Sequence, residues 1–119
     1  MDAFWEYYRG IEKGTKVTYE EFSLDERLKL EVKNSIKSLF KLILDEVKNR
    51  LGEINSKDLV WELAKKGVIK PELIQEYLDV IDLVTDIDYV DDLTLYTMLV
   101  RIMEDLEELY FSIIKFKNI

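Results

Sequence analysis

Apolar residues in this chain recur at intervals of three and four, the spacing of one face of an α-helix. The longest such stripe predicts a helix ending near Leu51, and it comprises Leu28, Val32, Ile36, Leu39, Ile43, Val47 and Leu51. Leu24, Phe40 and Leu44 widen this apolar face, as is typical of a central helix in a bundle. Gly52 suits the left-handed residue that ends a helix, because it has no Cβ.

A second long stripe predicts the last helix, opened by a capping Asp91 or Asp92. It comprises Leu95, Leu99, Ile102, Leu106, Leu109 and Ile113, flanked by Tyr96, Met103, Tyr110 and Phe116.

Shorter helices are predicted between and before the two long ones. Asp2 can cap a first helix that ends near Gly10 or Gly14 and carries Phe4, Trp5, Tyr8 and Ile11. Ser56 is expected to cap a helix through Leu59, Trp61, Leu63 and Ala64, ending at Lys65-Lys66-Gly67. Pro71 suits the first position of the next helix, whose apolar residues are Leu73, Ile74, Tyr77, Leu78, Ile81 and Leu83.

Two capping-box patterns lie before the first long helix. Thr18 and Glu21 form one, and Ser23 and Glu26 form the other, which is expected to open the helix that ends near Leu51. Together these patterns predict an all-α, up-and-down helical bundle of about four to five helices in one domain, residues 1–119.

The amino-acid composition limits the catalytic and binding chemistry that the chain can perform. The chain has no Cys and no His, so disulfides, thiolate nucleophiles and imidazole bases or ligands are excluded. We therefore expect no catalytic residue and no cofactor. It also has no run of eighteen apolar residues, and Asp2 and Glu6 stand where a signal peptide carries positive charge, so a cytoplasmic protein without a membrane span is expected.

The acidic excess is local. Residues 71–100 contain no Lys or Arg and eight carboxylates, which equal the net charge of -8: Glu72, Glu76, Asp79, Asp82, Asp86, Asp88, Asp91 and Asp92. A function that needs a basic group in this segment is excluded, whereas protein docking stays open. The candidate acidic docking surface comprises Asp79, Asp82, Asp86, Asp88 and Asp91.

An enzymatic alternative uses the same carboxylates. Asp79, Asp82, Asp86 and Asp88 could gather around Mg²⁺ or Mn²⁺ in a metal-dependent phosphodiesterase. The spacing of Asp86, Asp88, Asp91 and Asp92 departs from a calcium loop, because no Gly follows at the turn. Helix capping and a solvated loop are the favoured interpretation.

Lysines recur every four residues on the long helix, at Lys29, Lys33, Lys37 and Lys41. This lysine ladder is interpreted as the solvent face of an amphipathic helix, since the acidic total opposes nucleic-acid binding. The alternative is an accessory subunit of a nucleoprotein complex. Trp5 and Trp61 are assigned to packing, and Tyr7 is expected to be the exposed aromatic residue of the N-terminal cluster.

The order of elements resembles the HepT-like branch of the HEPN superfamily. The similar segments are Ile11 to Leu51 with Thr18-Tyr-Glu-Glu-Phe22 and Asp25, Ser56-Lys-Asp58 with the stretch to Ile69, and Asp91-Asp92, Leu95-Tyr96 and Asp105-Leu106-Glu107. The pattern covers roughly residues 4–114.

The resemblance implies a small helical bundle that dimerises, in a family of RNA-cleaving toxins paired with nucleotidyltransferase antitoxins. Activity in that family depends on an Arg followed by a His, usually between the last two long helices. This chain has no His, and no Arg lies between Arg50 and Arg101, so no catalytic residue is carried over. We expect a degenerate, non-catalytic homodimer that binds a nucleotidyltransferase-type or other basic protein.

Overall fold

The computed structural model describes residues 2–116, and this part of the chain is all-α with no strand. The helices are α1 (Asp2–Glu12), α2 (Tyr19–Leu24), α3 (Glu26–Leu51), α4 (Leu59–Lys65), α5 (Ile74–Thr85) and α6 (Asp92–Lys115). Three short 3₁₀ turns join them: η1 (Lys13–Lys16), η2 (Pro71–Leu73) and η3 (Ile87–Tyr89). The predicted all-α bundle with two long helices is confirmed.

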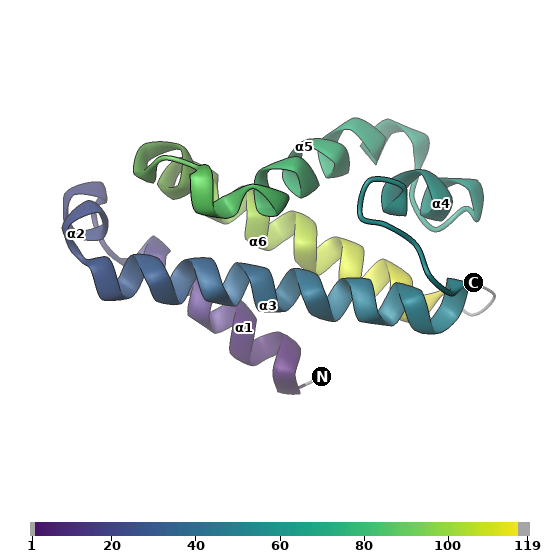
Figure 1. Cartoon of the computed structure of the whole chain (residues 1–119), viewed down its shortest axis with the longest axis horizontal. Coiled ribbons are helices and arrows are strands. Elements are labelled where there is room, and N and C mark those ends of the chain that lie inside the picture. The colour runs from purple at the N-terminus through teal and green to yellow at the C-terminus, as the bar shows by residue number, and fades with distance from the viewer. Residues whose placement is uncertain (1, 117–119) are drawn as a thin grey trace.

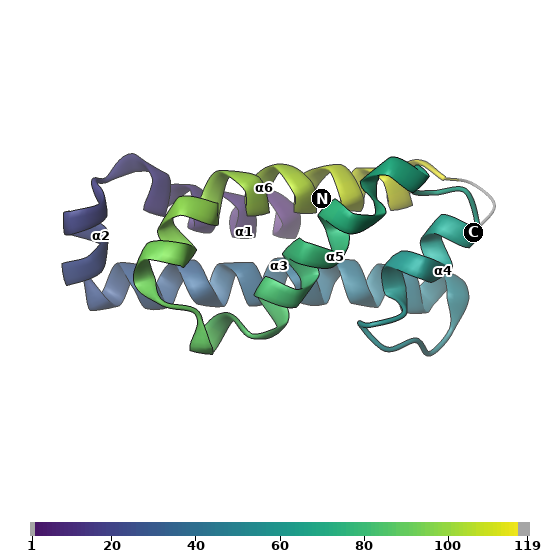
Figure 2. The ribbon, with the colours of Figure 1, turned by 90° about the horizontal axis from the view of Figure 1, so that it is seen from above.

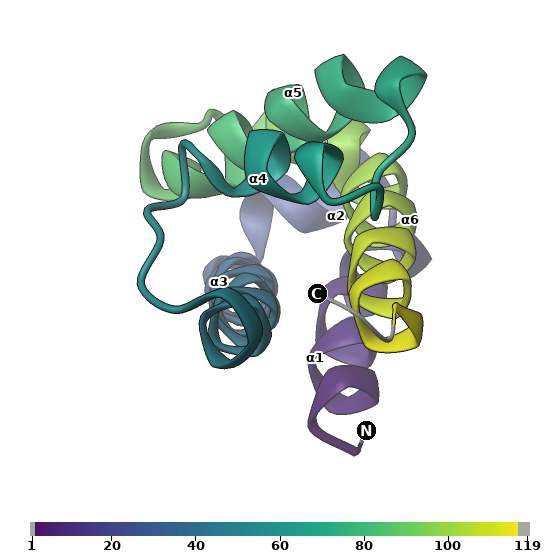
Figure 3. The ribbon, with the colours of Figure 1, turned by 90° about the vertical axis from the view of Figure 1, so that its right-hand side faces the viewer.

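The shorter helices lie on two sides of the two long helices, α3 and α6. Figure 1 shows α3 and α6 along the length of the molecule, with α1 on one side and the α4–α5 pair on the other. The end-on view confirms that α4 and α5 cover one side of α3 and α6 (Figure 3). Seen from above, α2 and the start of α6 share one end, whereas α4 lies at the opposite end (Figure 2).

The predicted apolar stripes form the core. On α3, Val32, Ile36, Leu39, Ile43 and Val47 are fully buried, and the α6 stripe from Leu95 to Ile113 is buried throughout. No polar or charged residue belongs to the buried class among residues 3–116. Within the described range, no helix combines the length and the apolar character needed to cross a membrane.

Local capping confirms several predictions. Thr18 Oγ1 accepts the backbone N–H of Glu21 at 3.2 Å, and the Glu21 carboxylate accepts the N–H of Thr18 at 3.0 Å, which completes a capping box. Asp91 Oδ1 caps α6 by accepting the N–H of Thr94 at 2.8 Å. Gly52 ends α3 with φ of +84°. The predicted cap at Asp2 falls on a side chain outside those that the structure describes.

The cap predicted at Ser23 is wrong. The Thr18 capping box starts α2, which continues through Leu24, so Ser23 is already helical. Asp25 caps α3 instead, and its Oδ1 accepts the N–H of Leu28 at 2.9 Å. Leu24 therefore lies outside α3 and is 84% exposed, contrary to the prediction that it widens the apolar face of that helix.

The cap predicted at Ser56 is also wrong. The side chain of Asn55 accepts the N–H groups of Lys57 and Asp58 at 3.0 and 3.1 Å, and this turn delays the start of α4 to Leu59. The predicted end of the helix is confirmed, because Gly67 adopts φ of +82° and its N–H donates to the carbonyl of Ala64.

The aromatic predictions are partly confirmed. Trp5 is partly buried and its ring lies edge-on to that of fully buried Phe4, with centroids 4.9 Å apart. Trp61 is 50% exposed, because α4 turns other residues toward the core, so its assignment to packing is wrong. Tyr7 is partly buried like Trp5 and Tyr8, so it does not stand out as the exposed member.

Candidate functional site

The five residues of the predicted acidic docking surface spread over three elements. Asp79 and Asp82 lie on α5, Asp86 follows that helix, Asp88 lies in η3 and Asp91 precedes α6. All five are exposed. The structure therefore distributes them over exposed positions of α5 and the turn that follows it, and none of the pockets that we describe gathers them.

Two basic side chains of α3 neutralise part of this segment. Lys37 Nζ on α3 donates to Asp88 Oδ2 at 2.7 Å, and Lys29 Nζ donates to Asp92 Oδ2 at 2.9 Å. Residues 71–100 thus contain no basic residue, but lysines of α3 lie beside them in the folded protein. Its carboxylates hold the turn between α5 and α6 against α3.

The lysine ladder is largely engaged by these contacts. Besides Lys29 and Lys37, Lys41 pairs with Asp45 on its own helix, at 2.9 Å. Three of the four ladder residues therefore have a carboxylate partner within the chain. A phosphate backbone would have to compete with these partners, which weakens the nucleoprotein alternative.

The metal alternative requires convergence of carboxylates. Among residues 2–116, no group of three or more acidic side chains is placed to hold a metal ion. Asp79 lies 3.7 Å from Nη2 of Arg101, and Asp88 is paired with Lys37. The predicted set Asp79, Asp82, Asp86 and Asp88 is not assembled around one point.

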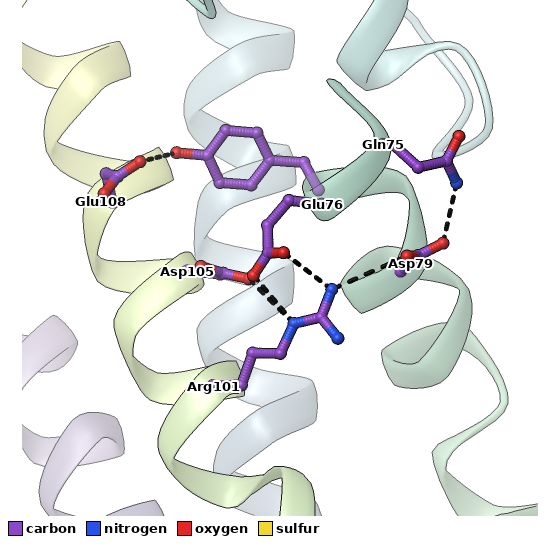
Figure 4. Close-up of polar contacts among 7 residues, drawn as sticks. Gln75, Glu76, Asp79, Arg101, Asp105 and Glu108 are labelled. Atoms are coloured by element: carbon purple, nitrogen blue, oxygen red, sulfur yellow. Dashed lines mark hydrogen bonds and ion pairs between the residues drawn. The ribbon is translucent and has the colours of Figure 1, made fainter. Parts of the chain in front are cut away.

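The strongest polar assembly is one that the sequence analysis missed. The α5–α6 cluster, as we define it, comprises Glu76, Tyr77, Asp79, Arg101, Asp105 and Glu108 (Figure 4). The guanidinium of Arg101 on α6 donates two parallel hydrogen bonds to Glu76 on α5, at 2.8 and 2.9 Å. Such a bidentate pair fixes both the distance and the orientation of the two helices.

Asp105 is the unusual member of this cluster. Its side chain is only 14% exposed, and Oδ2 is buried without a hydrogen-bond partner among the described residues. Burial raises the pKa of Asp105 to about 7, the neighbouring Glu76 carboxylate adds to the rise, and Arg101 opposes it. The adjacent Asp105 carboxyl group, together with Arg101, lowers the pKa of Glu76. Near neutral pH Asp105 is therefore partly protonated, whereas Glu76 stays ionised.

Tyr77 makes a second bridge between the two helices. Its hydroxyl donates to Glu108 Oε1 on α6. Burial, and next the hydrogen bond to Glu108, raises the pKa of Tyr77, so the phenol stays neutral. The cluster therefore ties α5 to α6 at two places along their contact.

The chemistry available to this cluster is limited. It contains no nucleophile paired with a base. The one group whose pKa lies near neutrality, Asp105, is packed against Glu76 and Arg101. The spacing of Arg101 and Asp105 by four residues, and of Glu76 and Asp79 by three, was visible in the sequence. The sequence did not show which faces of α5 and α6 contact each other, so the cluster could not be predicted from it.

A groove of about 720 Å³ lies between α1 and α3. It is open to solvent, and Leu30 in its lining is 60% exposed. The lining combines apolar, small and charged residues: Glu6, Tyr7, Arg9, Gly10, Lys13, Arg27, Leu30, Glu31, Asn34, Ser35 and Ser38. We refer to it as the α1–α3 groove.

Comparisons of this chain with protein-family models, with curated proteins and with solved structures give no match.

Proposed function

We propose that this protein is a non-catalytic, HEPN/HepT-like helical protein that acts by binding other proteins and itself forms a homodimer. Two observations support a binding role over catalysis. The chain has no His, and the titrating group of the α5–α6 cluster, Asp105, is enclosed by its own partners.

The α1–α3 groove is the observation that carries the homodimer. A two-fold contact brings the same patch of both copies together, so the patch must complement itself. The charges of the groove meet this requirement, because it carries Arg9 and Arg27 beside the acidic Glu6, and Glu31 there pairs with Lys13 of the same chain. Exposed Leu30 provides apolar surface at the same place. Opposite charges can therefore pair across the axis around an apolar centre.

A basic protein is the proposed heterologous partner. The net charge of -8 favours such a partner and opposes nucleic acid. The family resemblance suggests a nucleotidyltransferase-type protein and a link to a toxin–antitoxin system. The alternatives, a metal-dependent phosphodiesterase and a nucleoprotein subunit, gain no support from the placement of the carboxylates and lysines.

Leu30→Glu tests the homodimer. The substitution places a charge at the centre of the proposed interface, and we expect it to weaken self-association at least about tenfold. Sedimentation equilibrium over a range of concentrations measures this change. Leu30 is 60% exposed, so the variant is expected to keep its fold, which circular dichroism verifies.

Val100→Glu is the matched control. Val100 on α6 is 54% exposed and does not line the groove, so this variant should associate like the wild type. A wild-type protein that remains monomeric at high micromolar concentration contradicts the homodimer. Equal weakening by both variants would remove the α1–α3 groove from the proposal.

A further inference from the structure

Exposed apolar side chains concentrate at one end of the molecule. Tyr89 and Leu24 are the two most exposed large hydrophobic residues of the described chain, at 91% and 84%, and Leu93 is 53% exposed. Leu24 ends α2, Tyr89 ends η3 and Leu93 lies in the first turn of α6, and Figure 2 shows α2 and the start of α6 at the same end of the molecule. We name Leu24, Tyr89 and Leu93 the end patch.

Contacts between distant segments hold the end patch together. Ser23 Oγ, beside Leu24, lies 3.5 Å from Asp92 Oδ2, beside Leu93. Lys29 Nζ donates to the same Asp92 carboxylate at 2.9 Å. Leu24 and Leu93 thus flank one polar contact although they are far apart in the sequence. Their exposure is a property of the folded end and not of a loose terminus.

The surroundings of the end patch are acidic. The two segments that form it, 18–26 and 86–93, contain eight carboxylates and no basic residue. Seven of these carboxylates are exposed: Glu20, Glu21, Asp25, Glu26, Asp86, Asp88 and Asp91. Against them stand Lys29 and Lys37, which are already paired, and Arg27 and Lys33. The end therefore keeps a clear negative excess.

We infer that this end binds a basic amphipathic helix of a partner protein, whose apolar side chains cover Leu24, Tyr89 and Leu93 while its Lys or Arg residues meet the surrounding carboxylates. The inference rests on the proposed binding function and names the surface and the partner's chemistry. An amphipathic helix presents apolar anchors on one face and charges beside them, which matches an apolar patch with an acidic rim.

Charge excludes two other occupants. A second copy of the same end would bring two acidic rims together, and like charges across an interface oppose association. Nucleic acid would meet the same repulsion. The end patch is thus suited to a different protein, whereas the α1–α3 groove, with both signs of charge, is suited to a second copy.

A designed peptide tests this inference with the full chain. The probe is a Lys/Leu peptide of about 18 residues with Leu at helical spacing, and the comparison is a peptide of the same composition with the order scrambled. Backbone amide chemical shifts locate the bound peptide, and fluorescence anisotropy measures its affinity at two salt concentrations. We expect shifts confined to residues 18–26 and 86–93 and their neighbours, and weaker binding of the scrambled peptide.

Variants separate the apolar contribution from the charge. Leu24→Ser with Leu93→Ser removes apolar surface without adding negative charge, and we expect about tenfold weaker binding. Glu20→Gln with Asp86→Asn should weaken binding several-fold and reduce its salt dependence. Val100→Ser, an exposed apolar residue outside the end patch, is the control and should bind like the wild type.

Three results overturn the inference: equal binding of the scrambled peptide, shifts centred elsewhere on the surface, or no effect of the Leu24→Ser, Leu93→Ser variant. The test is independent of the homodimer, because Leu30→Glu leaves the end patch intact. Loss of peptide binding with an unchanged dimer, or the reverse, shows which of the two proposals has failed.

Discussion

Asp105 is a carboxyl group held where it resists ionisation. It is mostly buried, it faces the carboxylate of Glu76, and Arg101 lies 3.7 Å from its Oδ2. Glu108 on the same helix adds negative charge, whereas Tyr77 on α5 contributes a neutral hydroxyl. The folded chain therefore binds a proton at Asp105 more tightly than the unfolded chain does.

This difference predicts that stability falls as the pH rises toward neutrality. The pKa of Asp105 is about 7 in the folded state and about 3.9 in an unfolded chain. The contribution from its proton is fully present below the unfolded value and is lost as the pH rises through about 7. The lowered pKa of Glu76 acts in the opposite direction, but only at more acidic pH. Urea unfolding between about pH 5 and 8 measures the slope.

Asp105→Asn isolates the contribution of this residue. The amide can donate to Glu76 without ionising, so we expect the variant to be more stable than the wild type at about pH 8, by roughly 1–2 kcal/mol, with a flatter pH dependence. Asp45→Asn, at an exposed partner of Lys41, is the control and should keep the wild-type slope. An unchanged slope in Asp105→Asn would show that another group sets it.

At the residue scale, the sequence predicted the contacts made within one helical turn. Thr18 with Glu21, Asp91 as a cap and Gly52 as a stop depend on a spacing that can be read along the chain. The contacts of Lys37 with Asp88 and of Glu76 with Asp105 join helices. Such contacts depend on how the helices are placed, which a short spacing does not specify.

At the element scale, Gly10 sets how closely α1 approaches α3. A Cβ at this position would lie 2.1 Å from Ser35 Oγ and 2.9 Å from Ser35 Cβ, which is too close for either atom. The sequence suggested that the first helix ends near Gly10 or Gly14, but α1 runs through Gly10 to Glu12. Close packing, and not helix termination, explains this glycine.

Gly10→Ala is therefore expected to destabilise the protein, although Ala favours helices over Gly by about 1 kcal/mol. The clash with Ser35 must push α1 away from α3, and we expect a net loss of roughly 1–3 kcal/mol in the free energy of unfolding. Chemical denaturation measures it.

Ser35→Gly in the Gly10→Ala background is the control for that clash. It removes both contacting atoms, so part of the loss should be recovered despite the lower helix propensity of Gly. A Gly10→Ala variant as stable as the wild type would mean that α3 moves away from the new Cβ without a loss in the free energy of unfolding.

Element boundaries were predicted less well than the elements themselves. The α3 stripe is specified by many buried residues, so one mistaken cap did not change the helix. The observed start of α3 differs from the predicted one because Ser23 and Asp25 both have a side-chain oxygen that can cap a helix. Since α2 begins after Thr18 and includes Ser23, only Asp25 is free to cap α3. Asn55 excluded Ser56 in the same way.

At the scale of the whole molecule, the α4–α5 pair is tied to α6 by few polar contacts. Arg101 connects α6 to Glu76 and Asp79 of α5, and Tyr77 reaches Glu108. Without Arg101, three carboxylates would face one another across the two helices. The guanidinium thus both joins the layer to the long pair and suppresses its internal repulsion.

Arg101→Met is expected to loosen this layer selectively. We expect several-fold faster hydrogen exchange at the amides of α5, corresponding to about 1 kcal/mol, with little change in α1 or α3. Arg50→Met is the matched control, because Arg50 bonds Glu46 and the carbonyl of Phe116 and does not contact α5. Faster exchange in every helix would instead assign Arg101 a role in global stability.

The two tryptophans lie in different layers of the fold, so their fluorescence can distinguish the layers. Trp5 lies against the ring of Phe4 beside α6, whereas half-exposed Trp61 lies on α4 in the other layer. Their indoles should emit at different wavelengths, with Trp61 further to the red, because one is packed among aromatic rings and the other is partly in water. With one Trp replaced by Phe at a time, the intrinsic fluorescence of each variant reports on one layer, and comparison of the two unfolding curves shows whether the two layers melt together.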